Sequence, residues 1–125
     1  AVHNGAWIQL TAASVTGKFG KRAQYWSERM LDEGLVHILA TDAHNMRTRS
    51  PVLSQAVEAV SKRLGEEAAH DMVFTRPQAV LDNVSPSTLA PPAIPALVLL
   101  ADSAIASTGR ARRVNVAVFQ DYFLS

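Results

Sequence analysis

Runs of apolar residues separated by amphipathic segments predict strands and helices in alternation. Residues 6–10, "AWIQL", form a short apolar run between Gly5 and the small-residue segment "TAASVTG", which predicts a strand followed by a loop. Residues 35–41, "LVHILAT", are almost continuously apolar, a pattern typical of a strand covered on both faces in a parallel sheet. These two runs are the predicted strands of the fold.

Helical periodicity follows each predicted strand. Before Gly34, apolar residues recur at helical spacing, and the glycine itself suits the end of a helix. A second helix is predicted from Pro51 to Gly65, with Ser50 as its cap. The two apolar stripes are Phe19, Ala23, Trp26 and Met30, then Leu53, Ala56, Val57, Val60 and Leu64. Residues 66–73 and 76–83 predict short helices, so the order of elements indicates an α/β fold with parallel strands.

The pattern changes after Asn83. Residues 85–95, "SPSTLAPPAIP", hold four of the six prolines and predict a linker or extended segment. Residues 96–107 predict a short apolar helix, and residues 114–124 alternate like a strand. We therefore expect two regions, an α/β segment over residues 1–84 and a Pro-rich linker with an apolar tail over residues 85–125.

Composition limits the classes of function. The 125 residues suit one domain, and 48% hydrophobic residues suffice for a core. A net charge of +1 gives no reason to expect nucleic acid, and no apolar run reaches the roughly 18 residues of a membrane span. The absence of cysteine excludes disulfides and thiol chemistry and fits a reducing compartment, so we expect a cytoplasmic location. The N-terminus lacks signal-peptide character and leads directly into strand-like sequence, as in a chain entered partway through a domain.

Asp42 and His44 follow the second predicted strand and are the main candidates for chemistry. Residues two apart on an extended chain point to the same side, so both side chains can face one ion. A carboxylate with a neutral imidazole suits Zn, Mn or Fe, and α/β folds place active sites at the carboxyl ends of parallel strands. The alternative is a loop aspartate that caps a helix beside a partly exposed histidine.

Arg47 and Arg49 follow in the same loop. A guanidinium can bind two phosphate oxygens, and an arginine beside a metal site is a common clamp for phosphoryl groups. The alternative is an ordinary solvated arginine at each position.

Three quoted segments together resemble a known family. These are the "QLTAAS" loop, the "GKFG" helix start and the strand that ends in "TDAHN", within a match over about residues 5–84. They are similar to the C-terminal part of the bacterial metal-dependent tyrosine-protein phosphatases of the polymerase and histidinol phosphatase (PHP) superfamily, which are linked to capsule and exopolysaccharide synthesis. The resemblance implies part of a β/α barrel with metal ions at the carboxyl ends of its strands.

Carried over by residue, the resemblance implies that Asp42 and His44 are two ligands of a divalent metal. It also implies that Arg49 lies near the substrate phosphate, with a phosphorylated small molecule or a phosphotyrosine-type group as substrate. The family's other ligands, an early His-x-His pair, a middle His and a bridging Glu, would lie on strands before residue 1. From about residue 85 the resemblance ends, and the tail is a fusion, a shifted reading frame or a lineage-specific extension.

A partial barrel leaves strand edges and helix faces uncovered, and such surfaces favour association. We therefore expect a homo-oligomer that completes the truncated PHP-type barrel and brings copies of Asp42 and His44 together. The first functional hypothesis is a metal-dependent phosphoester hydrolase with a site assembled between subunits. The second is a catalytically inactive oligomeric remnant that serves as a structural or interaction module. A third is hydrolysis of activated esters or phosphotriesters.

The remaining candidates have simpler interpretations. His37 lies within the second predicted strand and alternates away from Asp42, so a structural role is predicted. His3 and His70 are predicted to be solvated. Lys18 and Lys21 open a helix where anions are favoured, but we expect ordinary solvated lysines.

Overall fold

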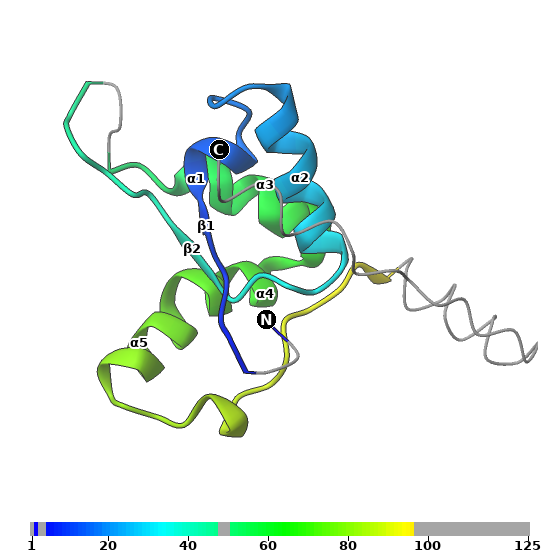
Figure 1. Ribbon diagram of the computed structural model, residues 1–125, viewed down its shortest axis with the longest axis vertical. Helices are drawn as coiled ribbons and strands as arrows, with labels where there is room; N and C mark the ends of the chain where they lie inside the picture. Colours follow the sequence, from blue (N-terminus) through cyan, green and yellow to red (C-terminus); the bar gives the residue numbers. More distant parts are fainter. Residues whose placement is uncertain (1, 3–4, 48–50, 97–125) are drawn as a thin grey trace, which may run out of the picture.

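Two short parallel strands form the centre of the structure. The computed structural model describes residues 2, 5–47 and 51–96 of the chain (Figure 1). Strand β1 (Gln9–Thr11) pairs in parallel with β2 (Ile38–Ala40), and Leu10 lies opposite Leu39. Parallel neighbours require a crossover connection, which the intervening helices provide. The predicted α/β class with parallel strands and helices is confirmed.

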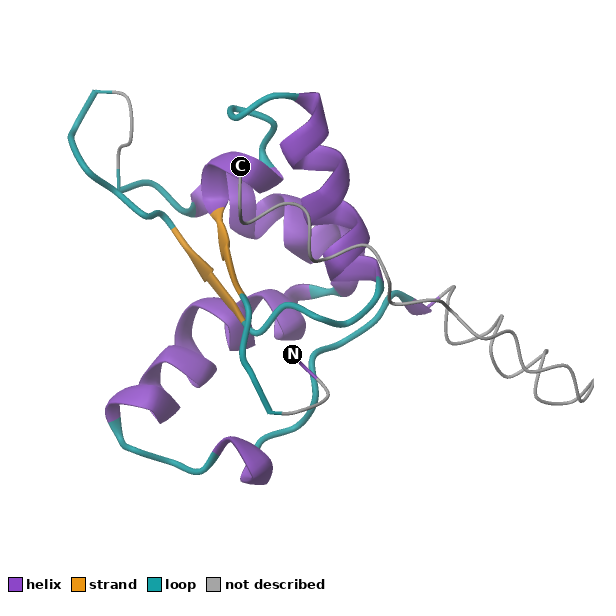
Figure 2. Ribbon diagram, viewed as in Figure 1, coloured by secondary structure: helices purple, strands orange, loops and turns teal. Residues whose placement is uncertain are grey.

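Helices connect and cover the strands (Figure 2). They are α1 (Ala12–Val15), α2 (Lys21–Asp32), α3 (Ser54–Leu64), α4 (Glu66–His70), a π-helical turn (Asp71–Thr75), α5 (Arg76–Leu81) and a 3-10 helix (Pro86–Thr88). The segment from α4 through the π-helical turn to α5 has no gap, so the two predicted short helices are continuous. The predictions for residues 97–125 lie outside the described residues.

The core lies between the sheet and the helices. Its most deeply buried large side chains come from α2, β2, α3, the π-helical turn and the loop before β2: Leu31, Leu39, Val60, Met72 and Val36. Leu10 joins them from β1, so the central residue of each strand packs into the same cluster. This shared burial fixes the strand pair, and therefore the end of β2, to the helices.

Two helix boundaries differ from the prediction. Residues 12–15 were expected in a loop but form α1, because Ala12 and Val15 lie one turn apart and are both buried. A four-residue helix is too short for its periodicity to be recognised in sequence. Helix α3 begins at Ser54, with Leu53 as its N-cap, rather than in the turn that begins at Pro51. Burial of this segment begins at Leu53, whereas Pro51 and Val52 are exposed.

Gly34 ends α2 as predicted. Its φ is 65°, in the left-handed region that glycine adopts without steric cost. The Gly34 N–H donates to the Leu31 carbonyl at 3.1 Å, and the Leu35 N–H donates to the Met30 carbonyl at 3.0 Å. This pair of bonds is the Schellman arrangement, which satisfies carbonyls at the helix end and turns the chain toward β2.

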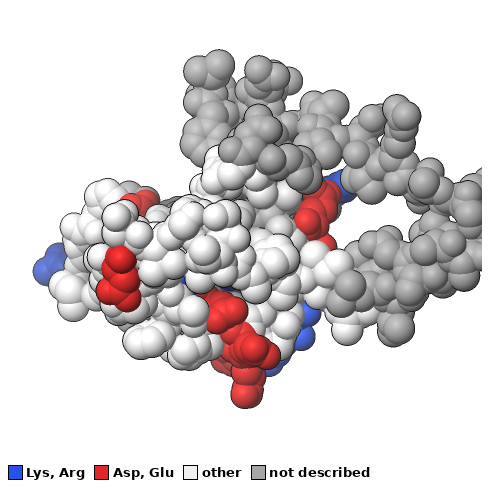
Figure 3. Space-filling model, turned by 90° about the horizontal axis from the view of Figure 1, so that it is seen from below, with Lys and Arg blue, Asp and Glu red and all other residues white. Residues whose placement is uncertain are grey.

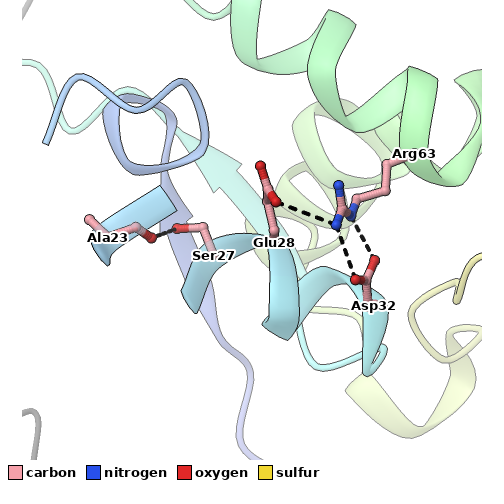
Figure 4. Close-up of polar contacts among 5 residues, drawn as sticks. All are labelled: Ala23, Ser27, Glu28, Asp32 and Arg63. Atoms are coloured by element: carbon pink, nitrogen blue, oxygen red, sulfur yellow. Dashed lines mark hydrogen bonds and ion pairs between the residues drawn. The ribbon is translucent and has the colours of Figure 1, made fainter. Parts of the chain in front are cut away.

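Ion pairs join α2 to α3 on the surface (Figure 4). Arg63 of α3 donates from Nε to Asp32 at 2.6 Å and lies 3.5 Å from Glu28, both on α2. These groups are about one third exposed, so the pairs add little to stability individually. In the view of Figure 3, small groups of acidic and basic side chains, some of them side by side, interrupt a mostly uncharged surface.

The Pro-rich segment packs back onto the domain through Arg76. We call residues 89–95 the strap. The Arg76 side chain is 4% exposed, and its guanidinium donates to the carbonyl of His37 at 3.3 Å and to those of Ala90 and Pro91 at 3.5 Å. The strap also covers Gly34, where an added Cβ would lie 2.7 Å from Cγ2 of Ile94. Arg76 therefore ties α5, the start of β2 and the strap together.

His37 is a buried structural residue, as predicted. Its side chain is 7% exposed and stacks on the Trp7 indole, with ring centroids 5.3 Å apart and planes 16° from parallel. The Ile8 N–H donates to Nδ1 at 3.2 Å, so this nitrogen must be unprotonated. Burial lowers the pKa of His37, and the positive charge of Arg76 lowers it further. In the folded chain, the His37 imidazole is therefore neutral.

Acid should destabilise the fold through His37. The unfolded chain binds this proton near the ordinary pKa of about 6.5, and the folded chain binds it only at lower pH. The free energy of unfolding should therefore be insensitive to this group above pH of about 6.5 and fall below it, by at most about 1.4 kcal/mol per pH unit. Urea unfolding across this range should show a smaller pH slope for His37→Phe. An equal loss of slope in His70→Gln would contradict the assignment to His37.

Candidate functional site

The candidate site is the loop that follows β2. The strand ends at Ala40, and the chain then runs into an exposed loop that extends away from the sheet beyond the strand's carboxyl end (Figure 1). Asp42 has a φ of 50°, so the backbone turns there instead of continuing as a strand. Aspartate and asparagine tolerate this left-handed conformation better than most residues. The residues that follow therefore leave the direction of β2.

Asp42 and His44 lie close together. The His44 Nδ1 is 3.8 Å from Oδ1 of Asp42 and 2.7 Å from the Asp42 backbone carbonyl. Both side chains are partly exposed, 42% for Asp42 and 56% for His44. Sequence reasoning predicted this closeness from the alternation of an extended strand, whereas the backbone at Asp42 is left-handed rather than extended. A carboxylate and an imidazole are thus presented to solvent at one point of the loop.

The arginines of the loop are only partly described. Arg47 is exposed, and its backbone N–H donates to the Asn45 side-chain oxygen at 3.0 Å, which shapes the chain after His44. Arg49, the predicted phosphate-binding residue, lies outside the described residues. Its role therefore stays a prediction.

The other candidates lie away from this loop. His70 is exposed on α4, with its ring 5.2 Å from that of Phe74. Lys18 and Lys21 are exposed before and at the start of α2, in agreement with their expected solvation. His3 lies outside the described residues. None of the described candidates adds a third donor to Asp42 and His44.

The donor set fits a divalent metal in kind but not in number. Oxygen and imidazole nitrogen donors suit Zn, Mn or Fe. Protein sites for such metals use at least three protein ligands. Within residues 2, 5–47 and 51–96, no group of three or more His, Asp or Glu side chains is placed to hold an ion. One protomer's described residues therefore supply part of a coordination sphere.

Comparison with known proteins supports the resemblance found in the sequence. The family model described as "Capsular polysaccharide synthesis, CpsB/CapC" matches residues 1–82, well over half of the chain. The chain belongs to the CpsB/CapC family. The matched residues include both strands, the Asp42–His44 loop and the helices through α5, so the whole candidate site lies within the part of the chain shared with the family.

Individual CpsB/CapC relatives are similar over the same region. Tyrosine-protein phosphatase YwqE of Bacillus subtilis (strain 168) is 38% identical over 66 residues, 53% of this chain and 26% of YwqE. Tyrosine-protein phosphatase CpsB of Streptococcus pneumoniae is 34% identical over 82 residues, 62% of this chain and 34% of CpsB. The chain thus spans about a quarter to a third of these curated relatives.

A solved structure shows the same relationship in three dimensions. It comes from crystal structures of YwqE from B. subtilis and CpsB from S. pneumoniae, described as unique metal-dependent tyrosine phosphatases. The TM-score is 0.64 at 32% sequence identity, over 75% of this chain and 37% of the solved chain. The arrangement of strands and helices described above is therefore that of this family.

One group in the site was missed by sequence reasoning. The backbone carbonyl of Asp42 lies 2.7 Å from Nδ1 of His44, yet the prediction considered side chains alone. The available signal was the residue type, since aspartate after a strand is tolerant of a left-handed turn.

No helix among the described residues is long and apolar enough to cross a membrane.

Proposed function

We propose that this chain is part of a metal-dependent phosphoester hydrolase, with Asp42 and His44 as two ligands of a divalent metal ion. The observation that supports this most directly is the closeness of Oδ1 of Asp42 and the His44 imidazole at the carboxyl end of β2. The relatives named above are tyrosine-protein phosphatases, and the solved ones are described as metal-dependent. A phosphotyrosine-type group or a phosphorylated small molecule is the proposed substrate.

The chain's own residues have separate roles in this proposal. When bound, a divalent ion in such a site polarises a phosphoryl oxygen and neutralises its developing charge. Asp42 supplies negative charge that favours the cation, and His44 supplies a neutral nitrogen donor. Arg49 binds oxygens of the substrate phosphate through its planar guanidinium. The exposure of Asp42 and His44 leaves the substrate side of the loop open.

We further propose that the site is assembled between subunits of a homo-oligomer. The described residues of one protomer provide two donors where at least three are needed. A second copy would bring another Asp42 and His44, and the same association would complete the truncated barrel. Such a loosely enclosed site would accept activated phosphoesters or phosphotriesters. The cytoplasmic location stays a prediction from the absence of cysteine.

The alternative function is an inactive oligomeric module. The observation that favours it is the same shortage of donors among the described residues. In that case Asp42 and His44 would be a remnant of the family's site, and the chain would act through its surfaces alone. Metal content and activity separate these two functions.

The test combines metal analysis, mass and activity on the full chain. We expect bound divalent metal in an oligomer and hydrolysis of p-nitrophenyl phosphate. Asp42→Ala and His44→Ala should each weaken metal binding by at least about 100-fold, because even outer-shell changes cost 10–100-fold. His70→Ala, which removes an exposed histidine outside the loop, is the matched control. An oligomer without metal or activity would establish the inactive module, and a metal-loaded monomer would refute assembly between subunits.

A further inference from the structure

The acidic and basic residues of this chain are unevenly distributed. No aspartate or glutamate occurs in residues 1–27, and Asp42 is the only one in residues 34–57. The cations of these two stretches are Lys18, Lys21, Arg22, Arg47 and Arg49. The acids of the segment between the two stretches, all within or at the end of α2, are Glu28, Asp32 and Glu33. The start of α2 is therefore basic, and its end is acidic.

The two basic stretches meet at the carboxyl end of the sheet. Strands β1 and β2 are parallel with Thr11 opposite Ala40, so the chain leaves both strands at the same edge, about 4.8 Å apart. After β1, the chain forms α1 and a loop that folds back on it, where the Phe19 N–H donates to the Ala13 carbonyl at 3.3 Å. After β2, it enters the loop of the candidate site. The loop before α2 and the loop after β2 therefore lie beyond the same edge of the sheet (Figure 1).

The exposed cations at this edge have no acidic partners in the described part of the chain. Lys18, Lys21 and Arg47 are exposed, and none of them forms an ion pair with a described residue. By contrast, the ion pairs of the described structure engage the cations of α3 and of the second half of α2. We call Lys18, Lys21 and Arg47 the basic face. Their solvation leaves positive charge available to an anionic ligand.

We propose that the basic face binds acidic residues that flank the phosphorylated residue of a peptide substrate. A phosphate group beside Asp42 lies on one loop, whereas Lys18 and Lys21 belong to the other. The charges of the second loop are then left for further acidic groups of the substrate, so a substrate with several negative charges is favoured over one with a single phosphate. The phosphorylated residue rests on the proposed function, whereas the charge of the basic face is a property of this chain alone.

A peptide fits this edge better than a nucleic acid does. Phe19, which stands between the two lysines in sequence, is 47% exposed and offers an apolar contact to a side chain of a peptide. The chain has a net charge of +1, and acids occupy the opposite end of α2. The basic face therefore lacks the extent of the basic stripe that a nucleic-acid backbone requires.

Binding to the basic face can be measured without turnover. In the full chain treated with a chelator, we would measure fluorescence anisotropy with a labelled peptide that has a central phosphotyrosine and acidic residues on both sides. The matched probe carries asparagine and glutamine in place of these acids. Loss of one exposed ion pair changes Kd about 2- to 5-fold, so the acidic probe should bind about tenfold more tightly at low salt. The preference should largely disappear at about 1 M salt, where charges are screened within about 3 Å. Equal affinities at low salt, or no binding of either probe, would overturn the proposal.

Matched substitutions locate the binding surface. Lys18→Gln combined with Lys21→Gln should remove most of the preference for the acidic probe, and Arg47→Gln should reduce it about 2- to 5-fold. The control is Lys62→Gln, which removes an exposed lysine that pairs with Glu58 on α3. An equal loss in the control would show that net charge alone decides, and full preference in the double variant would place the acids elsewhere. Either result refutes the proposal, as does equally tight binding of single-stranded DNA.

The same measurements distinguish this inference from the proposed function. A chain that prefers the acidic probe but hydrolyses no phosphoester would support the basic face as a docking surface and refute the hydrolase. A chain that hydrolyses the acidic and neutral peptides with the same KM at low salt would support the hydrolase and refute the docking surface.

Discussion

Replacing Arg76 by methionine should lower the free energy of unfolding by about 2–4 kcal/mol. The guanidinium is buried and donates to carbonyls of His37, Ala90 and Pro91, on two segments of the chain that are far apart in sequence. Methionine keeps most of the apolar stem but removes every donor, so these carbonyls lose their partner. A buried polar group left without a hydrogen bond costs about 1–3 kcal/mol.

Arg63→Met is the matched control for this prediction. It makes the same chemical change on the surface, where Arg63 pairs with Asp32 at 2.6 Å while about one third exposed. An exposed ion pair contributes about 0–1 kcal/mol, so urea unfolding should show a much smaller loss for Arg63→Met. Equal losses in the two variants would show that burial of the Arg76 guanidinium has no energetic consequence.

The Arg76 substitution should also release the strap. With the two strap carbonyls unpaired, hydrogen exchange at the amides of Ala93 and Ile94 should accelerate at temperatures where the domain stays folded. Gly34→Ala should also displace the strap, because the added Cβ would lie 2.7 Å from Cγ2 of Ile94. The φ of Gly34 is 65°, so alanine is strained at this position as well. Unchanged exchange in both variants would show that these contacts do not hold the strap.

Replacing Leu39 by alanine should lower the free energy of unfolding by a similar amount, about 3 kcal/mol. Leu39 is the central residue of β2, is 2% exposed and packs in the core cluster with Leu10. Deleting a buried leucine side chain loses its transfer free energy and leaves a cavity, with typical totals of about 2–5 kcal/mol. The effect should be large here because the sheet has only two strands among the described residues and little other packing to close the gap.

Leu81→Ala is the matched control, because it makes the same substitution at an exposed leucine. Leu81 ends α5 and is 81% exposed, so its truncation should change stability by less than about 0.5 kcal/mol. Both variants can be compared by urea unfolding followed by circular dichroism. If Leu39→Ala unfolds at the same urea concentration as Leu81→Ala, the strand pair does not depend on this core.

The parts of the fold set by local pattern were predictable from sequence. The apolar run around Leu39, the helix that ends at Gly34 and the helix that ends at Gly65 all follow from periodicity and glycine chemistry. Helix α1 was missed because its four residues gain stability from burial against the core, which no local window shows. The start of α3 at Ser54 was misplaced because its N-cap, Leu53, makes no side-chain capping bond, whereas Ser50 and Pro51 satisfy the usual rules for a helix start.

Contacts between distant segments were beyond sequence reasoning. An arginine before a proline reads as a helix start, and nothing local indicates that Arg76 is buried beneath the strap. The closeness of Asp42 and His44 was predicted from the alternation of an extended strand, but the left-handed backbone at Asp42 was not. Completion of the barrel and assembly of the site between subunits stay predictions, since local patterns within one sequence do not report association between copies.

The stacking of Trp7 on His37 makes the fluorescence of the Trp7 indole sensitive to the charge of the His37 ring. Indole emission is quenched by a protonated imidazole in contact with it and much less by a neutral one. In a Trp26→Phe variant, which leaves Trp7 as the single tryptophan, the charge state of this buried ring can therefore be followed by intrinsic fluorescence, without labels, while acid loosens the junction between the first strand and the second.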